Sequence, residues 1–546
     1  MTCDIPEFSY NDSNYDNASL SIQSIDDAIN ADARIKINNG NGKKFTWAVK
    51  TKASDDNLKT TILINDDVRH PIRGTINTNT QFVKVNDRIS TAIIDVEEST
   101  LHIGDSIWHI RPSNITYSKN NLVISNFAIT HDNQHLSING KATNEQSDSV
   151  LVDFKDLDVK YILDMVNFHS VEFSGLATGH AFVSGIFSKK PQAEADLTVN
   201  DFKFQDGRMG VLYANAQYDA DAGSIDINAT ANDGPDRRTI INGYVSPKQN
   251  SIDLDIEAHN TRIEFMESFC SSFMKDVNAH ANGSVKLSGP LNSINLTGRL
   301  VADGNLTLSS LNTTYALRND TIRFIPDEII FANDTIYDKY GNTGIIEGNI
   351  HHQHLTHLSY DLNIDMNNML AYNTNAGMSD SFYGTVYANG NCTIKGRSGE
   401  VIMDINATPC KNSIITYYVN SLSSADNHEF IQWKQQRLNQ SDENGEFAQS
   451  KDDKVQFSSD LRMNFLVNTT PDLTIKIIMD NITGDYITLN GDGTLRATYF
   501  NKGTLDIYGN YIVDHGLYRI TIRDFIKKDF SFERGSLIKF GGAPFS

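Results

Sequence analysis

The histidines are the side chains whose spacing most resembles a chemical site. His351, His352, His354 and His357 fall within the seven residues HHQHLTH. Imidazoles two positions apart on a strand lie on one face, so such a pair could ligate a transition metal. The same place in the preceding repeat of the chain, described below, reads SPKQNS. We therefore interpret the cluster as a polar connector and expect no metal site.

Other motifs with potential chemistry are weaker. The segment NNGNGKKFT around Gly40 and Gly42 lacks the spacing of a phosphate-binding loop. The NGDGT at residues 490–494 is too short for a calcium loop and is typical of a hairpin turn. The sequence contains neither G-x-S-x-G nor H-E-x-x-H. Its Asn-x-Ser/Thr triplets, as at Asn295 and Asn312, are expected of any chain rich in Asn and Thr. We expect a protein that is not an enzyme and has no cofactor.

The elements that carry these residues recur along the chain. A triplet that ends in glycine recurs along the chain. It is Ile-Asn-Gly at Gly140 and Gly243 and Ile-Glu-Gly at Gly348, at intervals of 103 and 105 residues. A second set of strand glycines, Gly179, Gly283 and Gly390, has intervals of 104 and 107. Repeats whose units carry incomplete apolar faces gain stability by stacking on their neighbours. The repeat predicts an elongated array in place of a catalytic globule.

Composition excludes some classes of protein. The chain has 546 residues, which is far above the size of a single core, and a formal charge of −21 with no basic runs, which argues against a nucleic-acid partner. No run of about 18 apolar residues occurs, and the N-terminus lacks the regions of a signal peptide. Cys3, Cys270, Cys392 and Cys410 have no metal or redox spacing, and we expect Cys270 and Cys392 to be small buried apolar residues. Read literally, this is a soluble cytoplasmic protein, but both ends read as interior sequence and suggest a fragment.

Five segments follow from the patterns. We expect a degenerate β-repeat region at residues 1–135, repeat units at 136–239, 240–344 and 345–455, and a segment of stronger alternation at 456–546. Each repeat has one short helical candidate. The best supported, within residues 261–277, places Met266, Phe269, Cys270, Phe273, Met274 and Val277 at i, i+3, i+4 spacing. Its weaker counterparts are residues 159–166 and 366–373. We expect these helices to lie over the edge or mouth of their own sheet, with a partner-binding helix as the alternative.

Alternation of apolar and polar residues predicts antiparallel sheet with one apolar face. Such a face is covered by closing, by a second sheet or by an apolar ligand. About 30 strands spaced about 4.8 Å apart would extend roughly 100 to 150 Å as one ribbon. Pattern alone leaves an open trough and a string of closed β-sandwiches as alternatives. A one-residue slip would turn each strand's apolar set to the other face. The residues that would line a trough are Val183, Val285, Leu287, Ile394, Met463, Phe465, Ile475, Ile477, Tyr518, Ile520 and Ile522.

The C-terminal stretch resembles the start of the C-terminal domain of the TamB family. The similarity rests on TPDLTIKIIMD, GDGTL, YGNYIVDHGLY, KKDF, GSLIKF and the final GGAP, in this order over about 90 residues. The repeats resemble TamB and AsmA-like proteins in general. The resemblance implies a mainly β, elongated, repetitive antiparallel β-taco, a curled ribbon with a hydrophobic groove and a few short helices. It also implies a periplasmic protein anchored in the inner membrane that carries phospholipids to the outer membrane. A TamA-type barrel would be its partner in outer-membrane protein assembly and secretion.

The chain departs from that family in two ways. It lacks the N-terminal transmembrane anchor and the remainder of the C-terminal domain, and both absences fit a fragment. Our leading hypothesis is a lipid conduit that contacts phospholipid acyl chains. The alternative is a scaffold that receives substrate strands at exposed sheet edges by β-augmentation. A third hypothesis, a surface adhesin of tandem β-sandwiches, predicts domains of about 104 residues that fold alone.

Overall fold

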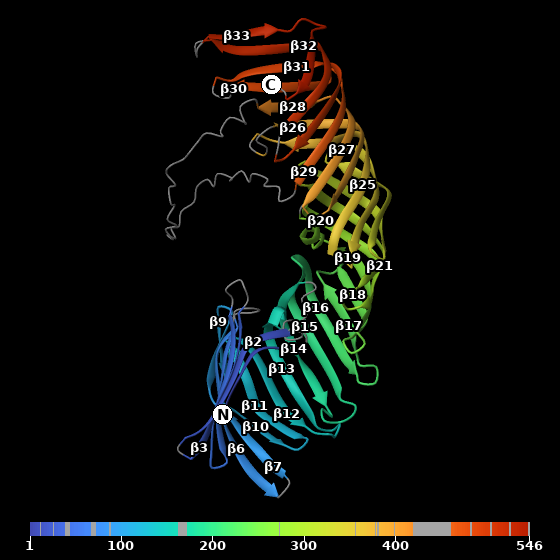
Figure 1. Cartoon of the computed structure of the whole chain (residues 1–546). Helices are drawn as coiled ribbons and strands as arrows, with labels where there is room; N and C mark the ends of the chain where they lie inside the picture. Colours follow the sequence, from blue (N-terminus) through green and yellow to red (C-terminus); the bar gives the residue numbers. More distant parts are fainter. Residues whose placement is uncertain are drawn as a thin grey trace, which may run out of the picture. The chain divides into compact units, whose positions relative to one another are not determined.

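Two compact units make up the computed structural model (Figure 1). One comprises residues 1–256 with 288–292, and the other residues 257–287 with 293–546. The structure describes the whole chain except residues 11–12, 26, 39–43, 67–71, 87–88, 162–171, 272, 355, 377, 379–381, 398, 419–459, 481–482, 503–504, 523–525 and 544–546. The described residues contain 34 strands, so the predicted mainly β, repetitive fold is confirmed.

Strands of the first unit are long and follow one another directly. They are β1 (Thr2–Tyr10), β2 (Ser13–Ile25), β3 (Ala28–Asn38), β4 (Lys44–Ser54), β5 (Asn57–Asp66), β6 (Ile72–Asn86), β7 (Ile89–Val96), β8 (Ser99–Ile103), β9 (Ser106–Ile110), β10 (Ser113–Ser118), β11 (Asn121–His131), β12 (Gln134–Ala142), β13 (Ser149–Asp158), β14 (Phe173–Ser184), β15 (Gln192–Phe204), β16 (Gly207–Asp219), β17 (Ser224–Asn232) and β18 (Arg238–Ser246). Two of the three unit boundaries fall within β19 (Ser251–Arg262) and β20 (Met274–Pro290), and the third lies just after β20.

The second unit continues the same pattern. Its strands are β21 (Asn295–Leu308), β22 (Thr313–Ile325), β23 (Glu328–Asp338), β24 (Thr343–Gln353), β25 (Thr356–Thr374), β26 (Phe382–Arg397), β27 (Glu400–Pro409), β28 (Ser413–Tyr418), β29 (Asp460–Thr469), β30 (Leu473–Asp480), β31 (Asp485–Phe500), β32 (Leu505–Ile522), β33 (Ile526–Ser531) and β34 (Leu537–Gly542). The helix α2 (Met266–Cys270) precedes β20.

Most neighbouring strands pair antiparallel, as the alternation predicts. From β11 to β18, for example, each strand pairs antiparallel with the next one in sequence. Two pairs differ, because β27 runs parallel to β29 and β28 runs parallel to β30. The expectation of a purely antiparallel sheet is therefore wrong at these two pairs. Alternation reports which face of a strand is buried, and it does not report the direction of the partner.

Several long strands face two shorter strands placed end to end. Strand β6 pairs with β7 along one part and with β8 along the other, and β26 pairs in the same way with β27 and β28. A buried serine joins the backbone at each break. The Oγ of Ser99 accepts the N–H of Asn77 at 3.2 Å, and the Oγ of Ser413 accepts the N–H of Tyr387 at 3.0 Å. These serines satisfy backbone groups where the ladder is interrupted.

A second device bends the strands. Three of the Asn residues in the left-handed region, with φ between 48° and 57°, each donate their backbone N–H to the side-chain Oδ1 of an Asn on a neighbouring strand, at 2.5 to 2.7 Å. The pairs are Asn126 with Asn139, Asn260 with Asn282, and Asn368 with Asn389. Each acceptor immediately precedes a repeat glycine. The Asn-Gly dipeptide of the repeat therefore caps a β-bulge on a neighbouring strand.

The repeat glycines have a steric reason. Gly140, Gly243 and Gly348 have φ values of 135°, 143° and 128°. A Cβ on any of them would lie 2.0 to 2.2 Å from a carbonyl oxygen of the adjacent strand. Only glycine allows so close an approach of two bent strands. The period read from the sequence thus marks points where neighbouring backbones nearly touch.

The predicted helices are mostly absent. The amphipathic pattern at residues 261–277 gives only the five-residue α2, and Met274 and Val277 belong to β20. Residues 366–373 lie within β25, where Met369 and Leu370 are each 1% exposed, so that prediction is wrong. In the third candidate, residues 159–161 are helical and 162–166 lie outside the described residues. In β20 and β25, pairing with neighbouring strands buries the apolar side chains and overrides the local helical period.

Candidate functional site

The sheet of the first unit has one apolar face. Rows of paired residues can be followed across seven consecutive strands, β12 to β18, and on one face their members are apolar or glycine. One row is Ile138, Val152, Ala181, Ala195, Ala216, Ile227 and Gly243. The next is Leu136, Phe154, Gly179, Leu197, Ala214, Ala229 and Ile241. We call this side the apolar face.

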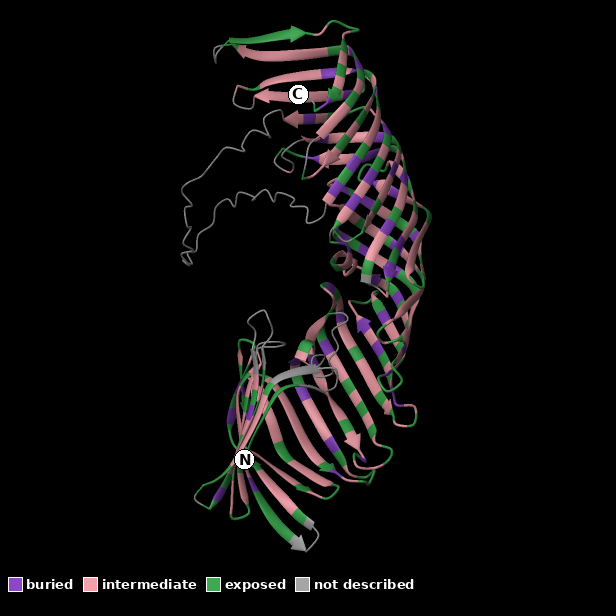
Figure 2. Cartoon of the chain, in the orientation of Figure 1, coloured by how far each residue is buried: buried purple, intermediate pink, exposed green. Residues whose placement is uncertain are grey.

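The opposite side of the same strands is polar. Between those two rows runs Ser137, Asp153, His180, Asp196, Asn215, Asn228 and Asn242. Its side chains bond to their neighbours, as His135 does to Asp153 at 2.8 Å and Asn215 to Asp196 at 2.9 Å. Figure 2 shows buried segments alternating with exposed ones along the strands. A two-sided sheet of this kind buries or covers only one face.

The second unit repeats the arrangement. Across β24, β25, β26, β27, β29, β31 and β32 the apolar row is Gly348, Leu362, Ile394, Met403, Met463, Tyr499 and Leu505. The adjacent polar row is Glu347, Asn363, Thr393, Asp404, Asn464, Thr498 and Asp506. Met403 and Met463 are 2% and 3% exposed, whereas Asn464 is exposed and donates to Asp404 at 2.8 Å.

Every lining residue predicted from the sequence can be placed on this map. Val183 lies on the face of Ala177, and Val285 and Leu287 share a face of β20 with Ala279 and Ala281. Ile394, Met463 and Phe465 pack in one cluster of the second unit, and Ile475 packs with Leu489 in another. Ile477 pairs with Ile487, which in turn pairs with Tyr518.

The last two predicted residues lie at a more open place. Ile520 and Ile522 pair with Lys528 and Ile526 of β33, and all six residues of β33 are exposed. Ile522, Ile526 and Phe530 are 43%, 42% and 53% exposed. The apolar face therefore continues to this margin with less cover than in the centre of the unit.

Sequence reasoning missed most of the apolar face in the first unit. Trp108, Ile110, Phe154 and Phe202 form the centre of its largest cluster and are 9% exposed or less. The prediction named only Val183 there. Alternation in DSIWHIRP and VLVDFKDL carried the missing signal, and combining strands into rows requires the register that only the structure gives.

Helix α2 and the residues that follow it cover part of the apolar face of the second unit. Phe273 lies with its ring 5.0 Å from that of Tyr360 on β25, and Cys270 is 3% exposed. Burial raises the pKa of the Cys270 thiol to about 11 and that of Cys392 to about 12. Both thiols are therefore protonated at neutral pH, and both cysteines pack within apolar clusters, as expected from the sequence.

A few acidic groups also lie on the apolar face. Asp320 pairs with Ala302 and Asp334 with Ile346. Burial raises the pKa of both carboxyls. Each accepts a backbone N–H at a bulge, from Arg318 at 2.9 Å and from Ala332 at 3.1 Å. We interpret them as caps that satisfy interrupted backbone.

Three histidines of the HHQHLTH segment lie beside two carboxylates. The side chain of His352 is 0% exposed, and burial lowers its pKa, so the ring is neutral. His352 and His354 each place Nδ1 3.6 Å from the carboxylate of Asp327, and His351 lies beside Glu328. In the part of the chain that the structure describes, no group of three or more His, Cys, Asp or Glu is arranged to hold a metal ion.

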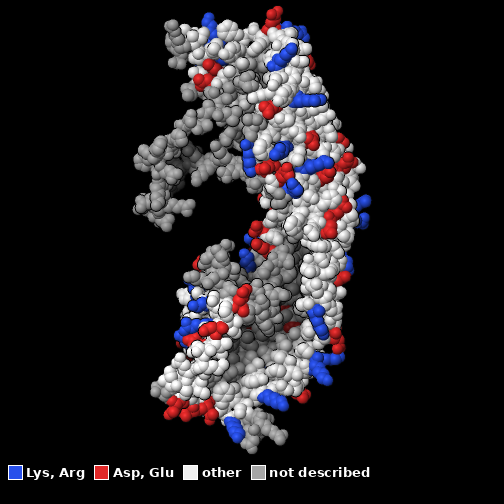
Figure 3. All heavy atoms as spheres, viewed as in Figure 1, with Lys and Arg blue, Asp and Glu red and all other residues white. Residues whose placement is uncertain are grey.

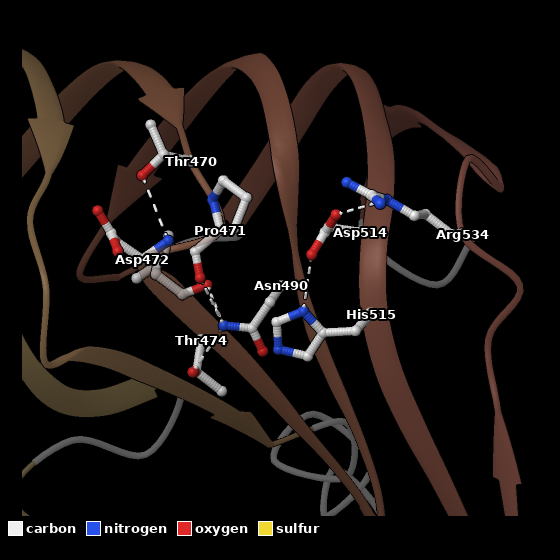
Figure 4. A network of polar contacts seen from close by, with 9 residues as sticks. Thr470, Pro471, Asp472, Thr474, Asn490, Asp514, His515 and Arg534 are labelled. Atoms are coloured by element: carbon white, nitrogen blue, oxygen red, sulfur yellow. Dashed lines mark hydrogen bonds and ion pairs between the residues drawn. The ribbon is translucent and has the colours of Figure 1, made fainter.

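Polar contacts tie the strands of the C-terminal segment together (Figure 4). The side-chain amide of Asn490 donates to the carbonyl oxygens of Pro471 and Leu473, both at 3.0 Å, and to Thr474 Oγ1 at 2.9 Å. These bonds join β31 to the break between β29 and β30. The NGDGT glycines lie inside β31, so the expected hairpin turn there is wrong. The motif sits at a bulge in the β31–β32 pairing.

A second group in Figure 4 fixes β32. The carboxylate of Asp514 lies 3.1 Å from His515 Nδ1 and 2.9 Å from Arg534 Nε. The hydrogen bond with His515 and the charge of Arg534 lower the pKa of Asp514. Asp514 is the unpaired residue of the β32 bulge opposite Asn490 and Gly491. The TPDL, GDGTL and YIVDHG phrases of the sequence thus meet at one interrupted region of the sheet.

The fold and its two faces define a class of protein: a repetitive β-sheet protein whose two units each have an apolar face. Residues 332–546 match the family model described as the TamB C-terminal domain. The resemblance seen in the sequence is therefore confirmed for this part of the chain, and the match begins further toward the N-terminus than the C-terminal motifs on which the resemblance rests. No curated protein and no solved structure gives a significant match. The family indicates an envelope protein with a role in outer-membrane biogenesis. Within the described residues, no helix is both long enough and apolar enough to span a membrane.

Proposed function

We propose that the protein is a non-enzymatic periplasmic bridge that carries phospholipids between the inner and outer membranes along its apolar face. The observation that carries this proposal is the rows of apolar and glycine residues that cross seven strands in each unit. A lipid acyl chain needs a continuous apolar path, and a single reactive residue contributes nothing to such transport. The proposed setting is anchorage in the inner membrane and contact with a TamA-type barrel in the outer membrane, as the family implies.

The energetics of such a path follow from burial. Each acyl methylene removed from water contributes about 0.8 kcal/mol. Neighbouring rows offer similar apolar surroundings, so a chain that moves by one strand exchanges one apolar contact for another of comparable free energy. In these rows the polar side chains point to the other face, and Asp320 and Asp334, which lie on the apolar face elsewhere, already accept backbone N–H groups. Lipid would thus be retained without being held at one position.

Photo-crosslinking in cells tests the proposal directly. A photoreactive residue is placed at Phe465 on the apolar face and, as matched control, at the adjacent Asn464 on the polar face. We expect a phospholipid adduct at position 465 that is absent at position 464, identified by mass spectrometry. A protein adduct at 465, or none at either position, would contradict the lipid path.

A second candidate function rests on one edge of the sheet. All six residues of β33 are exposed, and among the described strands β33 pairs only with β32. An edge strand of this kind can receive a strand of another protein by β-augmentation. A scaffold for outer-membrane protein assembly or secretion would use this edge. Crosslinks from Lys527 of β33 to a barrel protein, with no lipid adduct at position 465, would favour the scaffold.

A further inference from the structure

The polar face of β3 to β6 has the opposite charge from the chain as a whole. The apolar face of these strands is set by Ile35, Trp47, Ile64 and Gly74, which pair in one row. The positions between them point to the other side and include Arg34, Lys36, Lys50, Lys52 and Lys59. Asp32 is the only carboxylate at a polar-face position of these strands that the structure describes. We call this surface the cationic face.

Cations outnumber carboxylates at the described polar-face positions of these strands, and the nearest further carboxylates are Asp55 and Asp56 in the turn that joins β4 to β5. Arg34 donates two hydrogen bonds to Asp32, at 2.7 and 2.8 Å, and this pair is neutral. Lys52 and Lys59 pair directly across β4 and β5, and both are exposed. Like charges directly opposite each other destabilise a sheet. The chain already has a formal charge of −21, so a pair of lysines is not needed to keep it soluble.

Apolar side chains lie among the lysines. Leu63 is 40% exposed on the same face of β5, and Val83 of β6 is also 40% exposed. Ile25, at the end of β2, is 50% exposed. Exposed apolar residues interleaved with lysines are typical of surfaces that rest on lipid headgroups. An acidic protein partner would bind through the lysines alone and would not require exposed apolar side chains.

We propose that the cationic face docks on the headgroup surface of a membrane that contains anionic phospholipid. Lysine ammonium groups act as point charges toward phosphate and need no fixed bidentate geometry. Figure 3 shows Lys and Arg side chains on the N-terminal strands, with Asp and Glu side chains beside them. This docking does not depend on whether the apolar face carries lipid, because a scaffold at the envelope would use the same contact.

Vesicle flotation of the full chain tests the docking. The probes are vesicles of phosphatidylglycerol mixed with phosphatidylcholine, compared with phosphatidylcholine alone. A lysine near an anionic surface contributes about fivefold to partitioning, so the double variant Lys52→Gln, Lys59→Gln should bind about 25-fold more weakly. Binding should also fall as salt is raised.

Matched controls separate this effect from net charge and from folding. Lys155→Gln with Lys203→Gln removes two exposed lysines of the same unit and should leave binding unchanged. Lys52→Arg with Lys59→Arg keeps the charges and should retain binding. The proposal is overturned if the Gln variant of the cationic face floats like the unchanged protein, if both Gln variants lose binding equally, or if neutral vesicles bind as well. Binding to polyglutamate without binding to anionic vesicles would also overturn it, in favour of an acidic protein partner.

Discussion

Replacing Gly348 by alanine tests the steric explanation of the repeat. Gly348 lies on β24 with φ +128°. A Cβ there would lie 2.2 Å from the carbonyl oxygen of Asp361 and 3.0 Å from the Cα of Leu362, both on β25. Because these atoms belong to backbone, the contact is relieved only by moving one strand away from the other.

The expected cost can be built from two terms. A residue with a Cβ held in this region of φ is strained by about 1 to 3 kcal/mol. Separation of the strands weakens ladder hydrogen bonds that contribute about 1 kcal/mol each. We therefore expect a loss of about 3 kcal/mol in the local opening free energy, which is about 150-fold in the opening equilibrium. The cost should be concentrated in β24 and β25.

Hydrogen exchange followed by mass spectrometry measures this opening strand by strand. Amides of β24 and β25 should lose protection in Gly348→Ala, while β31 and β32 should change little. The matched control is Gly541→Ala on β34, where a Cβ would meet no heavy atom within 4 Å. If Gly348→Ala protects its strands as well as Gly541→Ala does, close approach of backbones is not the reason for the repeat glycines.

Three further predictions concern the same unit. Met403→Ala should lower the free energy of unfolding by about 2 to 5 kcal/mol because it leaves a cavity in the buried cluster, whereas Ile402→Ala on the polar face should cost less than half as much, measured by denaturant titration. Asn389→Ala should speed exchange of the Asn368 amide, whose 2.7 Å bond it removes, and Asn389→Asp, which keeps an acceptor, should restore protection; equal exchange in both would contradict the cap. Burial opposes the ionised form of Asp338, but its bonds from Asn342, Leu370 and Tyr340 prevail and lower its pKa below the ordinary 3.8. A lowered carboxyl pKa stabilises the fold above the unfolded value and loses this effect as pH falls through the folded value, so Asp338→Asn should be destabilising at pH 7 and nearly neutral in strong acid. A mutational cost that stayed constant with pH would refute this account.

Lipid transport and strand scaffolding place different demands on this sheet. The first needs the apolar rows, and the second needs a free edge such as β33. Phe465→Asp would put a charge in the apolar row while leaving β33 unchanged. Loss of lipid adducts with retained barrel crosslinks would therefore assign the two activities to separate parts of the molecule.

The sequence by itself determined the β character, the repeat and the alternation of faces. These properties are local, because side chains alternate along any strand and a glycine is required wherever two backbones approach closely. Gly140, Gly243 and Gly348 could thus be identified as structural markers before their φ values were known. The C-terminal motifs were enough to indicate the family. The repeat boundaries at residues 136, 240 and 345 stay a prediction.

Only the tertiary structure decided which strands pair and how. The parallel pairing of Met403 on β27 with Met463 on β29 joins residues 60 positions apart, and nothing in either strand specifies the direction of its partner. The apolar rows depend on register, which is a relation between strands. The pattern around Cys270 has a helical period, yet Met274 enters β20, because pairing across the sheet satisfies more backbone groups and buries the same apolar side chains. Local sequence determines which side chains lie on each face of a strand, and hydrogen bonding between distant strands determines which residues those side chains pack against.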